Sequence, residues 1–413
     1  MVQLHKKAVY GKTNEVALNI NEVMTGFSYT DNQFYVGGSD DFRIFVSCTE
    51  EVKLIGRIVD PVDSWGDQFL IPSLKNAGTQ YTFAMPTSDG SAKGLIAILP
   101  INTEDYVKVH IVGYSNGALF SSKDIEYSIS RGRSQYYISI DLFTRNSGNT
   151  LNYNNNVSIS ITTTSDVMIS FASVYATTSN TISLCGVSCI DNYVTFMPTA
   201  SSLKPCNTLL TPPDQRMITN HFTTRLHLSP PNLGSFCSAI TSITVYDGVD
   251  NIQGTEEIVD KMGFTEISLM NNAFAGFSTD IGEVNTNRFG SITDGNKITN
   301  FGHFMHYVPS TVEWLSGKTQ FFTSAKKCVL EFYADADGSN GKFIKIDGSI
   351  LETLKFDRTP LPIFENKYSQ FIVTINGYGL HTIENPGKYV AYVICENGPT
   401  DAAGYLTGFN QRK

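Results

Sequence analysis

The segment Gly113-Tyr-Ser115-Asn-Gly117 has the Gly-x-Ser-x-Gly spacing that carries the nucleophile of many serine hydrolases. In those enzymes a strained turn between a strand and a helix exposes the serine hydroxyl. His381 lies later in the chain, and Asp335 or Asp337 lies between the two. This order of serine, acid and histidine predicts, as one hypothesis, a serine hydrolase that uses Ser115, Asp335 and His381.

The same segment also has the pattern of a β-hairpin. Asn116-Gly117 is an ordinary two-residue turn, because asparagine and glycine both tolerate a positive φ. A nucleophile elbow must lead into a helix, whereas residues 118–127 have only a weak helical pattern and run into further strands. We therefore expect a hairpin without catalytic residues, and the hydrolase remains the alternative.

Asp335, Asp337 and Ser339 occupy every second position, like the oxygen ligands at the start of a calcium loop. An EF-hand loop also needs glycine at its sixth position and glutamate at its twelfth. This chain has Asn340 and Ile346 there. We expect a hairpin without a bound metal or cofactor, and these three residues are the weak candidates for a metal site.

The chain contains seven cysteines, too few for a scaffold built on disulfides. Three of them, Cys185, Cys189 and Cys206, could bind zinc, but no histidine lies at the spacing of a zinc finger. A loop pinned by disulfides is the simpler interpretation in an oxidising compartment. The candidates for disulfide bonds are Cys185, Cys189, Cys206, Cys237, Cys328 and Cys395.

Acidic side chains outnumber basic ones: 39 Asp and Glu against 30 Lys and Arg give a net charge of −9. This charge opposes a phosphate backbone, so we expect no nucleic-acid partner. No apolar run reaches the roughly 20 residues of a membrane helix, so we expect no membrane span. No secretory leader is visible at the start of the sequence. Asn156, in Asn156-Val-Ser158, is a candidate for glycosylation if the chain is secreted.

Apolar side chains alternate with polar ones along most of the chain, as in Val107, Val109 and Ile111. Asn-Gly and Asp-Gly pairs separate these runs and are typical of tight hairpins. Helical pattern is confined to residues 255–262, where a threonine precedes two glutamates and Gly263 follows. The sequence therefore predicts an all-β protein of two or more antiparallel β-sandwich-like units with very little helix.

Two internal similarities suggest how the chain is divided. Residues 47–54 resemble residues 100–109, and both have the pattern of a strand, a polar turn and a second strand. Residues 165–175 resemble residues 385–395, which indicates two related β-units, one ending near residue 178 and one at the C-terminus. We place an N-terminal unit in residues 1–180 and one or more C-terminal units in residues 181–413. The cysteine-containing segment 179–212 is the expected junction.

Several short motifs resemble the IgGFc-binding protein N-terminal domain family. In the C-terminal third these are Phe343-Ile-Lys-Ile-Asp347-Gly348, Phe371-Ile-Val-Thr-Ile-Asn-Gly377, Gly379-Leu-His381, Tyr389-Val-Ala-Tyr392 and Gly404-Tyr405-Leu-Thr-Gly408-Phe409. Earlier, the segment from Ser165 to Tyr175, followed by Cys185 and Cys189, also fits. The resemblance implies a secreted, β-rich module with disulfides and without known catalytic residues.

The preferred interpretation is therefore a non-enzymatic extracellular protein for binding or structural work. Tyrosines and asparagines in exposed loops would contact a protein or a glycan, as aromatic and polar loops commonly do. Two alternatives remain open. One is the serine hydrolase with Ser115, and the other is an intracellular or particle-associated structural β protein with reduced thiols.

Overall fold

The computed structural model consists of β-strands and short 3-10 turns, and no α-helix forms in the part of the chain that it describes. It describes residues 6–19, 34–59, 66–88, 93–103, 105–142, 144–145, 151–152, 156–173, 176–178, 193–204, 209–232, 241–260, 265–293, 300–396 and 401–412. All strand pairs are antiparallel within these residues, so the predicted all-β fold class is confirmed.

The helix expected at residues 255–262 is wrong. Thr255–Val259 forms strand β18, which pairs with β17 (Thr241–Asp247). Gly248 has a φ of 76°, and the turn η4 (Val249–Asn251) that follows it returns the chain along β17. So short a helix would be marginal by itself, and residues Thr255–Val259 pair with β17 over the whole length of β18 instead.

The first sheet nearly closes into a barrel. Its strands lie in the order β1-β9-β6-β12-β7-β8, and β4 and β14 also pair with β12. The two edges meet through the rings of Phe34 and Phe120, whose centroids lie 6.1 Å apart in a T-shaped arrangement. The strands are β1 (Phe34–Ser39), β4 (Gly78–Ala84), β6 (Lys93–Pro100), β7 (Tyr106–Ser115), β8 (Ala118–Ser128), β9 (Gln135–Asp141), β12 (Val157–Ser173) and β14 (Val194–Phe196).

The middle of the chain forms two four-stranded sheets. One has the order β15-β20-β17-β18 and the other β19-β16-β21-β22. Besides β17 and β18, their strands are β15 (Asp214–Thr219), β16 (Thr223–Leu228), β19 (Thr265–Ser268), β20 (Phe274–Thr279), β21 (Thr286–Thr293) and β22 (Asn300–Tyr307).

The last part of the chain forms a second eight-stranded sheet, of order β26-β25-β29-β24-β28-β27, and β23 and β30 also pair with β29. Its strands are β23 (Leu315–Thr323), β24 (Lys327–Ala334), β25 (Lys345–Ile346), β26 (Ser349–Ile350), β27 (Phe356–Leu361), β28 (Tyr368–Asn376), β29 (Gly379–Glu396) and β30 (Ala402–Leu406). Its turns are η5 (Thr311–Glu313), η6 (Asp337–Ser339), η7 (Leu351–Thr353) and η8 (Phe364–Asn366).

A few short elements lie outside these sheets. β2 (Leu54–Val59) and β3 (Gly66–Ile71) form a hairpin, followed by the turn η1 (Leu74–Asn76). Two further pairs join β5 (Thr87–Ser88) to β13 (Ala176–Thr177) and β10 (Thr144–Arg145) to β11 (Leu151–Asn152).

The pairings show that one β-unit occurs three times in tandem. We name its strand positions A to H in chain order. Strand G is the longest and pairs with four others: A and C pair with its first half, and B and H pair with its second half. Two further pairs complete the unit, because B also pairs with F and C pairs with D. The first unit is β4, β6, β7, β8, β9, β12 and β14, with β1 at E. In the middle unit, β15 to β18 take positions A to D and β19 takes position F. There β20 and β21 form the two halves of G, and β22 takes position H. The last unit is β23 to β30 without a gap.

Equivalent residues make equivalent bonds in the three units. In each, the residue after strand B donates its backbone N–H to a carbonyl at the middle of G: Ile101 to Asp166 (3.5 Å), Ser229 to Asn285 (2.8 Å) and Asp335 to Lys388 (3.0 Å). An aromatic residue, Phe196, Phe304 or Tyr405, also occupies the same register of strand H. Residues 165–173 of the first similar segment and residues 385–395 both lie in strand G. Val167 and Tyr389 are the matching positions in the pairing, so the sequence similarity is offset from the structural match by two residues.

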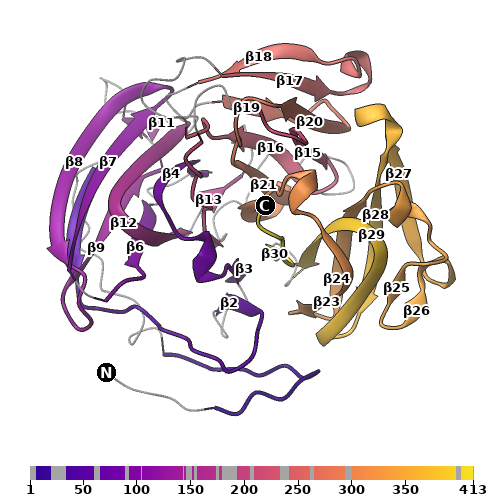
Figure 1. The fold of residues 1–413 in the computed structure, drawn as a ribbon, viewed down its shortest axis with the longest axis horizontal. Helices are drawn as coiled ribbons and strands as arrows, with labels where there is room; N and C mark the ends of the chain where they lie inside the picture. Colours follow the sequence, from indigo (N-terminus) through magenta and orange to yellow (C-terminus); the bar gives the residue numbers. More distant parts are fainter. Residues whose placement is uncertain are drawn as a thin grey trace.

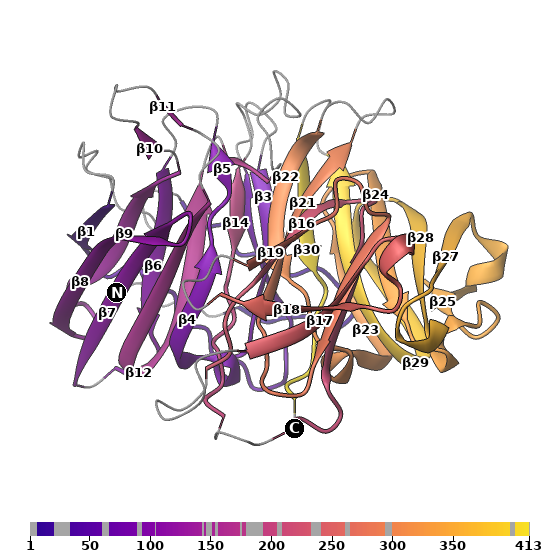
Figure 2. The ribbon, with the colours of Figure 1, turned by 90° about the horizontal axis from the view of Figure 1, so that it is seen from above.

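The three units lie as neighbouring sectors around a common centre (Figure 1), and in the second view they follow one another from left to right (Figure 2). The middle unit shares its hydrophobic core with the last one, since Ile218 and Phe277 pack in one buried cluster with Tyr333 and Tyr392. The predicted division at residues 179–212 stays a prediction, because much of that segment lies outside the described residues.

A buried ion pair joins the middle and last units. Arg288 on β21 and Glu331 on β24 are both fully buried, and Nη1 of Arg288 donates to Oε2 of Glu331 at 2.7 Å. Tyr333 and Gln370 each donate to the other carboxylate oxygen at 2.7 Å. The guanidinium lies 4.9 Å from the ring centroid of Tyr392. Every charge in this network has its partner on another strand, so the network fixes how the two units meet.

We predict that Arg288→Met destabilises the protein by about 3–5 kcal/mol, because Glu331 stays buried without its cation. The double variant Arg288→Met/Glu331→Leu should recover about 2 kcal/mol or more, since neither charge then remains. Urea denaturation of both variants measures the difference. Equal loss of stability in the single and the double variant would contradict the role of the pair.

Candidate functional site

The structure places Ser115 at the end of β7, where it leads into a hairpin. Asn116 and Gly117 have φ values of 50° and 78° and form the turn, and β8 begins at Ala118. The predicted hairpin is therefore confirmed at this position. The helix that a nucleophile elbow requires does not follow Ser115.

The residues of the hydrolase hypothesis are not brought together. β7 and β29, which carry Ser115 and His381, lie at opposite sides of the molecule (Figure 1). Nδ1 of His381 lies 2.6 Å from Oδ2 of Asp347, and its ring stacks on Phe321 with centroids 5.5 Å apart. His381 therefore contacts a carboxylate of the last unit and not Ser115.

The hairpin expected at the calcium-loop candidate is wrong, because β24 pairs with β28 and β29 and β25 pairs with β26 and β29. Asp335 organises a backbone turn there instead. Its Oδ1 accepts hydrogen bonds from the backbone N–H of Gly338 (2.7 Å) and of Lys388 (3.1 Å). Ser339 donates its hydroxyl to the carbonyl of Asp335 at 2.6 Å. In the described part of the chain, no group of three His, Cys, Asp or Glu side chains could hold a metal ion.

Cys328 and Cys395 form a disulfide between the paired strands β24 and β29. The other four candidates, Cys185, Cys189, Cys206 and Cys237, lie outside the described residues. Asn156 is half-buried, and its Oδ1 accepts a hydrogen bond from Nη1 of Arg225 at 3.1 Å. The candidate glycosylation residue thus lies where the first and middle units meet.

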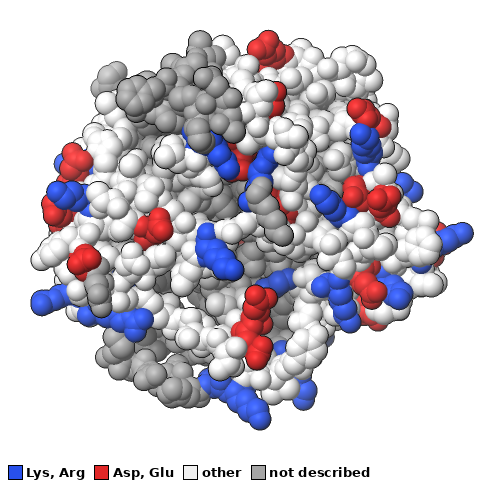
Figure 3. All heavy atoms as spheres, viewed as in Figure 1, with Lys and Arg blue, Asp and Glu red and all other residues white. Residues whose placement is uncertain are grey.

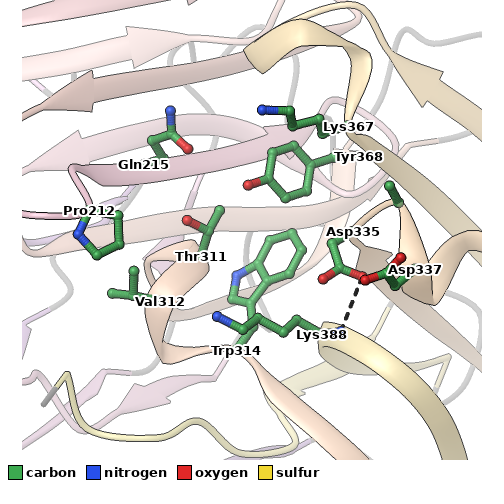
Figure 4. A pocket seen from close by; sticks show the side chains of 11 residues that line it. Pro212, Gln215, Thr311, Val312, Trp314, Asp335, Asp337, Lys367, Tyr368 and Lys388 are labelled. Atoms are coloured by element: carbon green, nitrogen blue, oxygen red, sulfur yellow. Dashed lines mark hydrogen bonds between the residues drawn. The ribbon is translucent and has the colours of Figure 1, made fainter.

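A pocket of about 320 Å³ lies at the junction of the middle and last units. We call it the junction pocket. Aromatic, charged and amide side chains from five separate segments converge there (Figure 4). Its lining residues are Pro212, Gln215, Thr311, Val312, Trp314, Asp335, Ala336, Asp337, Lys367, Tyr368 and Lys388.

Buried charges lie behind the part of the junction pocket that β15 forms. Successive side chains of a strand point to opposite faces, so Gln215 faces the pocket while Asp214 and Arg216 point inward, where both are buried. Nε of Arg216 donates to Oδ1 of Asp214 at 3.1 Å, and its Nη1 donates to the carbonyl of Val308 at 2.6 Å. Gln215 is therefore held by a strand whose neighbouring side chains are anchored on the inside.

Glu313 fixes the turn η5, which carries Thr311, Val312 and the following Trp314 into the lining. Its Oε2 accepts hydrogen bonds from the backbone of Ser310 (2.7 Å) and from the hydroxyl of Tyr307 (2.9 Å). Burial, opposed in part by the nearby Arg216, raises the pKa of Glu313 to about 7.

The opposite rim is a strained turn between β27 and β28. Phe364, Glu365 and Asn366 have φ values of 51°, 61° and 58°. Left-handed backbone costs roughly 1–2 kcal/mol per residue, so surrounding contacts must hold it. The ring of Phe364 packs on Tyr246 of the middle unit, with centroids 5.0 Å apart. The turn delivers Lys367 and Tyr368 to the pocket.

Hydrogen-bonding groups and two aromatic rings share the junction pocket. Trp314 and Tyr368 form a T-shaped pair with centroids 5.3 Å apart. The hydroxyl of Tyr368 and the ammonium of Lys388 both extend across the opening (Figure 4). Lys367 pairs with the exposed Glu365 at 2.6 Å, whereas no ion pair involves Lys388 among the described residues. The arrangement can stack on a ring and donate hydrogen bonds to polar groups of a ligand.

Positive and negative side chains are interspersed on the face seen in Figure 3, without a broad patch of one sign. In the part of the chain that the structure describes, no helix is long and apolar enough to cross a bilayer. No protein-family model matches the chain, and no curated protein matches it either.

Sequence reasoning missed the junction pocket as a site. Its residues range from Pro212 to Lys388, and none belongs to a motif with fixed spacing. One local signal was present: Ser310-Thr-Val-Glu313 is a capping box, which the structure forms at η5. Trp314, one of only two tryptophans, follows it directly. The two aspartates, Asp335 and Asp337, were singled out, but as metal ligands or as the acid of a serine hydrolase.

We predict that Glu313 makes the protein more stable below pH 4.5 than at pH 7.5. Its folded-state pKa of about 7 exceeds the ordinary value of 4.5, so its stabilising contribution is complete below pH 4.5 and is lost as the pH rises to about 7. Glu313→Gln, which stays neutral, should remove a pH-dependent change on the order of 2 kcal/mol.

Urea denaturation at pH 4.5, 6 and 7.5 measures this change as the difference between the wild type and the variant. Glu352→Gln, at an exposed glutamate of the same unit, is the control and should follow the wild type at each pH. Parallel pH profiles for the wild type and Glu313→Gln would show that Glu313 titrates normally.

Proposed function

We propose that this chain is a non-enzymatic extracellular binding protein that recognises a protein or a glycan through the junction pocket. The observation that carries the proposal is the convergence of Trp314, Tyr368 and Lys388 on one pocket whose walls are anchored by buried charges. Pockets that orient a ligand commonly combine aromatic side chains with a few well-placed polar groups.

The rigidity of the walls supports recognition. Glu313 fixes η5 and the aspartate Asp335 fixes the loop beside Lys388, so two sides of the pocket are set before a ligand arrives. A binding site that is ordered in advance loses less conformational entropy on binding. Two aromatic rings beside lysine and amide groups are the combination that a binding pocket commonly uses, so these side chains support binding.

Two observations support an extracellular setting. The disulfide between Cys328 and Cys395 is of a kind that persists in oxidising compartments. The resemblance to the IgGFc-binding protein N-terminal domain family points the same way, because that family implies secreted β-rich modules. Membership of that family is part of the proposal.

A binding screen tests the proposal. The full chain is applied to an array of neutral, sialylated and sulfated glycans and to immobilised mucin, collagen, fibronectin and laminin. We expect at least one ligand, and we expect Lys388→Ala to weaken its affinity about tenfold, because a charged hydrogen bond is lost. The backbone N–H of Lys388 still donates to Asp335 in this variant, so the loop is preserved.

The control for the screen is Lys342→Ala, which removes an exposed lysine of the same unit outside the pocket lining. It should bind like the wild type. Equal binding by Lys388→Ala would place recognition elsewhere on the chain. Stoichiometric labelling by a fluorophosphonate that depends on Ser115 would instead support the hydrolase.

We predict that protein from its native source shows fewer than seven titratable thiols under denaturing conditions without reductant. Cys328 and Cys395 should be absent from the thiol count, because they are joined in the folded protein. Alkylation followed by peptide mass spectrometry identifies the protected pair. Seven free thiols would favour the intracellular alternative and contradict the extracellular part of the proposal.

A further inference from the structure

Comparison of the three units shows that, among the described residues, the middle one has no strand at position E. In the first unit β1 occupies this position beside β9, and in the last unit β27 occupies it beside β28. The equivalent strand of the middle unit is β19, which pairs with β16 alone among the described residues. The outer side of β19 thus corresponds to a place that a strand fills in both sister units.

The middle unit has no room for its own strand E. In the last unit, β27 lies between β26 and β28 in the chain, where residues 351–367 are available. In the middle unit β18 ends at Val259 and β19 begins at Thr265, so only residues 260–264 connect positions D and F. A strand of usual length with a turn at each end needs more than twice that number.

The first unit shows that position E accepts a strand from elsewhere in the sequence. Its β1 precedes the whole unit and lies about 100 residues before β9, with which it pairs over its full length. Phe34 of β1 lies opposite the buried Ile140 of β9, and Phe356 of β27 lies opposite the buried Val373 of β28. In both units the strand at E runs antiparallel to F and supplies apolar side chains.

The backbone of β19 is oriented to receive such a strand. Leu269, directly after β19, donates its N–H to the carbonyl of Thr224 beside β16 at 2.9 Å. Backbone groups alternate in direction along a strand, so the backbone groups of Glu266 and Ser268 point to the outer edge. The carbonyl of Ser268 already accepts a hydrogen bond from Nδ2 of Asn272 at 3.5 Å, so Glu266 is the residue on which the added pairing depends. The side chain of Ile267 is 4% exposed and belongs to the core that the middle and last units share.

The charges near β19 indicate what kind of strand would fit. The neighbouring described residues 241–260 contain five acidic side chains and no lysine or arginine: Asp247, Asp250, Glu256, Glu257 and Asp260. Glu256 and Glu257 are both exposed, and partial loss of solvation together with the nearby Asp247 raises the pKa of Glu257. An acidic partner would be repelled there, whereas a basic one would be attracted.

We infer that β19 accepts, by strand addition, an extended segment of another polypeptide that has apolar residues at alternate positions and basic residues at its ends. The segment pairs antiparallel to β19 and completes the middle unit as β1 and β27 complete the others. Main-chain hydrogen bonds provide the affinity, and the acidic strand β18 selects for basic flanks. This surface is distinct from the junction pocket and does not depend on the proposed function.

The probe is a synthetic eight-residue peptide that alternates valine and threonine between flanking lysines, with a glutamate-flanked version as control. Both carry a fluorophore and are titrated into the full chain, with anisotropy as the readout. Hydrogen exchange of the wild-type complex locates the bound peptide. We expect protection of the backbone N–H of Glu266 and about tenfold weaker binding of the glutamate-flanked peptide.

Glu266→Pro and Glu266→Gln form the matched pair of variants. Both lose the carboxylate that pairs with Arg225, but only proline removes the N–H at the edge. We expect Glu266→Pro to weaken binding of the lysine-flanked peptide about tenfold and Glu266→Gln to weaken it less than about threefold. A second variant, Glu256→Lys/Glu257→Lys, should reverse the preference between the two peptides without altering the edge itself.

Protection at another edge, such as that of β8, β18 or β27, would overturn the inference, as would equal binding by Glu266→Pro and Glu266→Gln. No binding of either peptide would also overturn it. If Glu266→Pro does not fold, the hydrogen-exchange map of the wild type and the charge-reversal variant still decide the question.

Discussion

Burial of charge between the middle and last units is the constraint on which the rest of this part of the molecule depends. Arg288 with Glu331, and Arg216 with Asp214 and Glu313, are removed from solvent together. A buried charge is tolerated only with its partners in place, and here Arg288 and Arg216 belong to the middle unit, whereas Glu331 and Glu313 belong to the last one. The two units are therefore parts of one body, and the junction pocket has walls that keep their positions.

All three units repeat the same strand pairings, so the differences between them arise from local departures from the repeat. In each unit strand G is shared by the strands on both sides, so its bend at the middle sets the shape of the unit. In the middle unit strand G is interrupted at residues 280–285, between β20 and β21. The interruption lets Val284 donate its N–H to Asp214 at 2.8 Å, which completes the buried charge cluster under the pocket. This departure from the repeat thus supplies one of the hydrogen bonds that hold the buried charges in place.

Much of the fold could be predicted from the sequence, because alternation of side chains and hairpin turns are local signals. Asn116-Gly117 is an example, since two residues specify the turn. The similarity of residues 165–175 to 385–395 indicated a repeat, but the third copy was not recognised. Its strand G is broken, so the continuous pattern that marks β12 and β29 is absent from the middle of the chain.

The helix expected at residues 255–262 was wrong for a related reason. The capping pattern at Thr255 is local, whereas the pairing of β18 with β17 is a tertiary effect that overrides it. The junction pocket could not be predicted at all. It exists only where the repeat brings Gln215, Trp314 and Lys388 together from distant parts of the sequence.

The way in which each unit obtains strand E accounts for both the junction pocket and the outer edge of β19. In the last unit strand E lies within the unit, so the chain must turn from β27 into β28, and this strained turn delivers Lys367 and Tyr368 to the junction pocket. In the middle unit no strand of the described residues pairs with the outer side of β19, and only residues 260–264 connect β18 to β19. In the first unit strand E comes from the beginning of the chain. Units that share one set of pairings can therefore carry different surfaces, because each obtains this single strand in a different way.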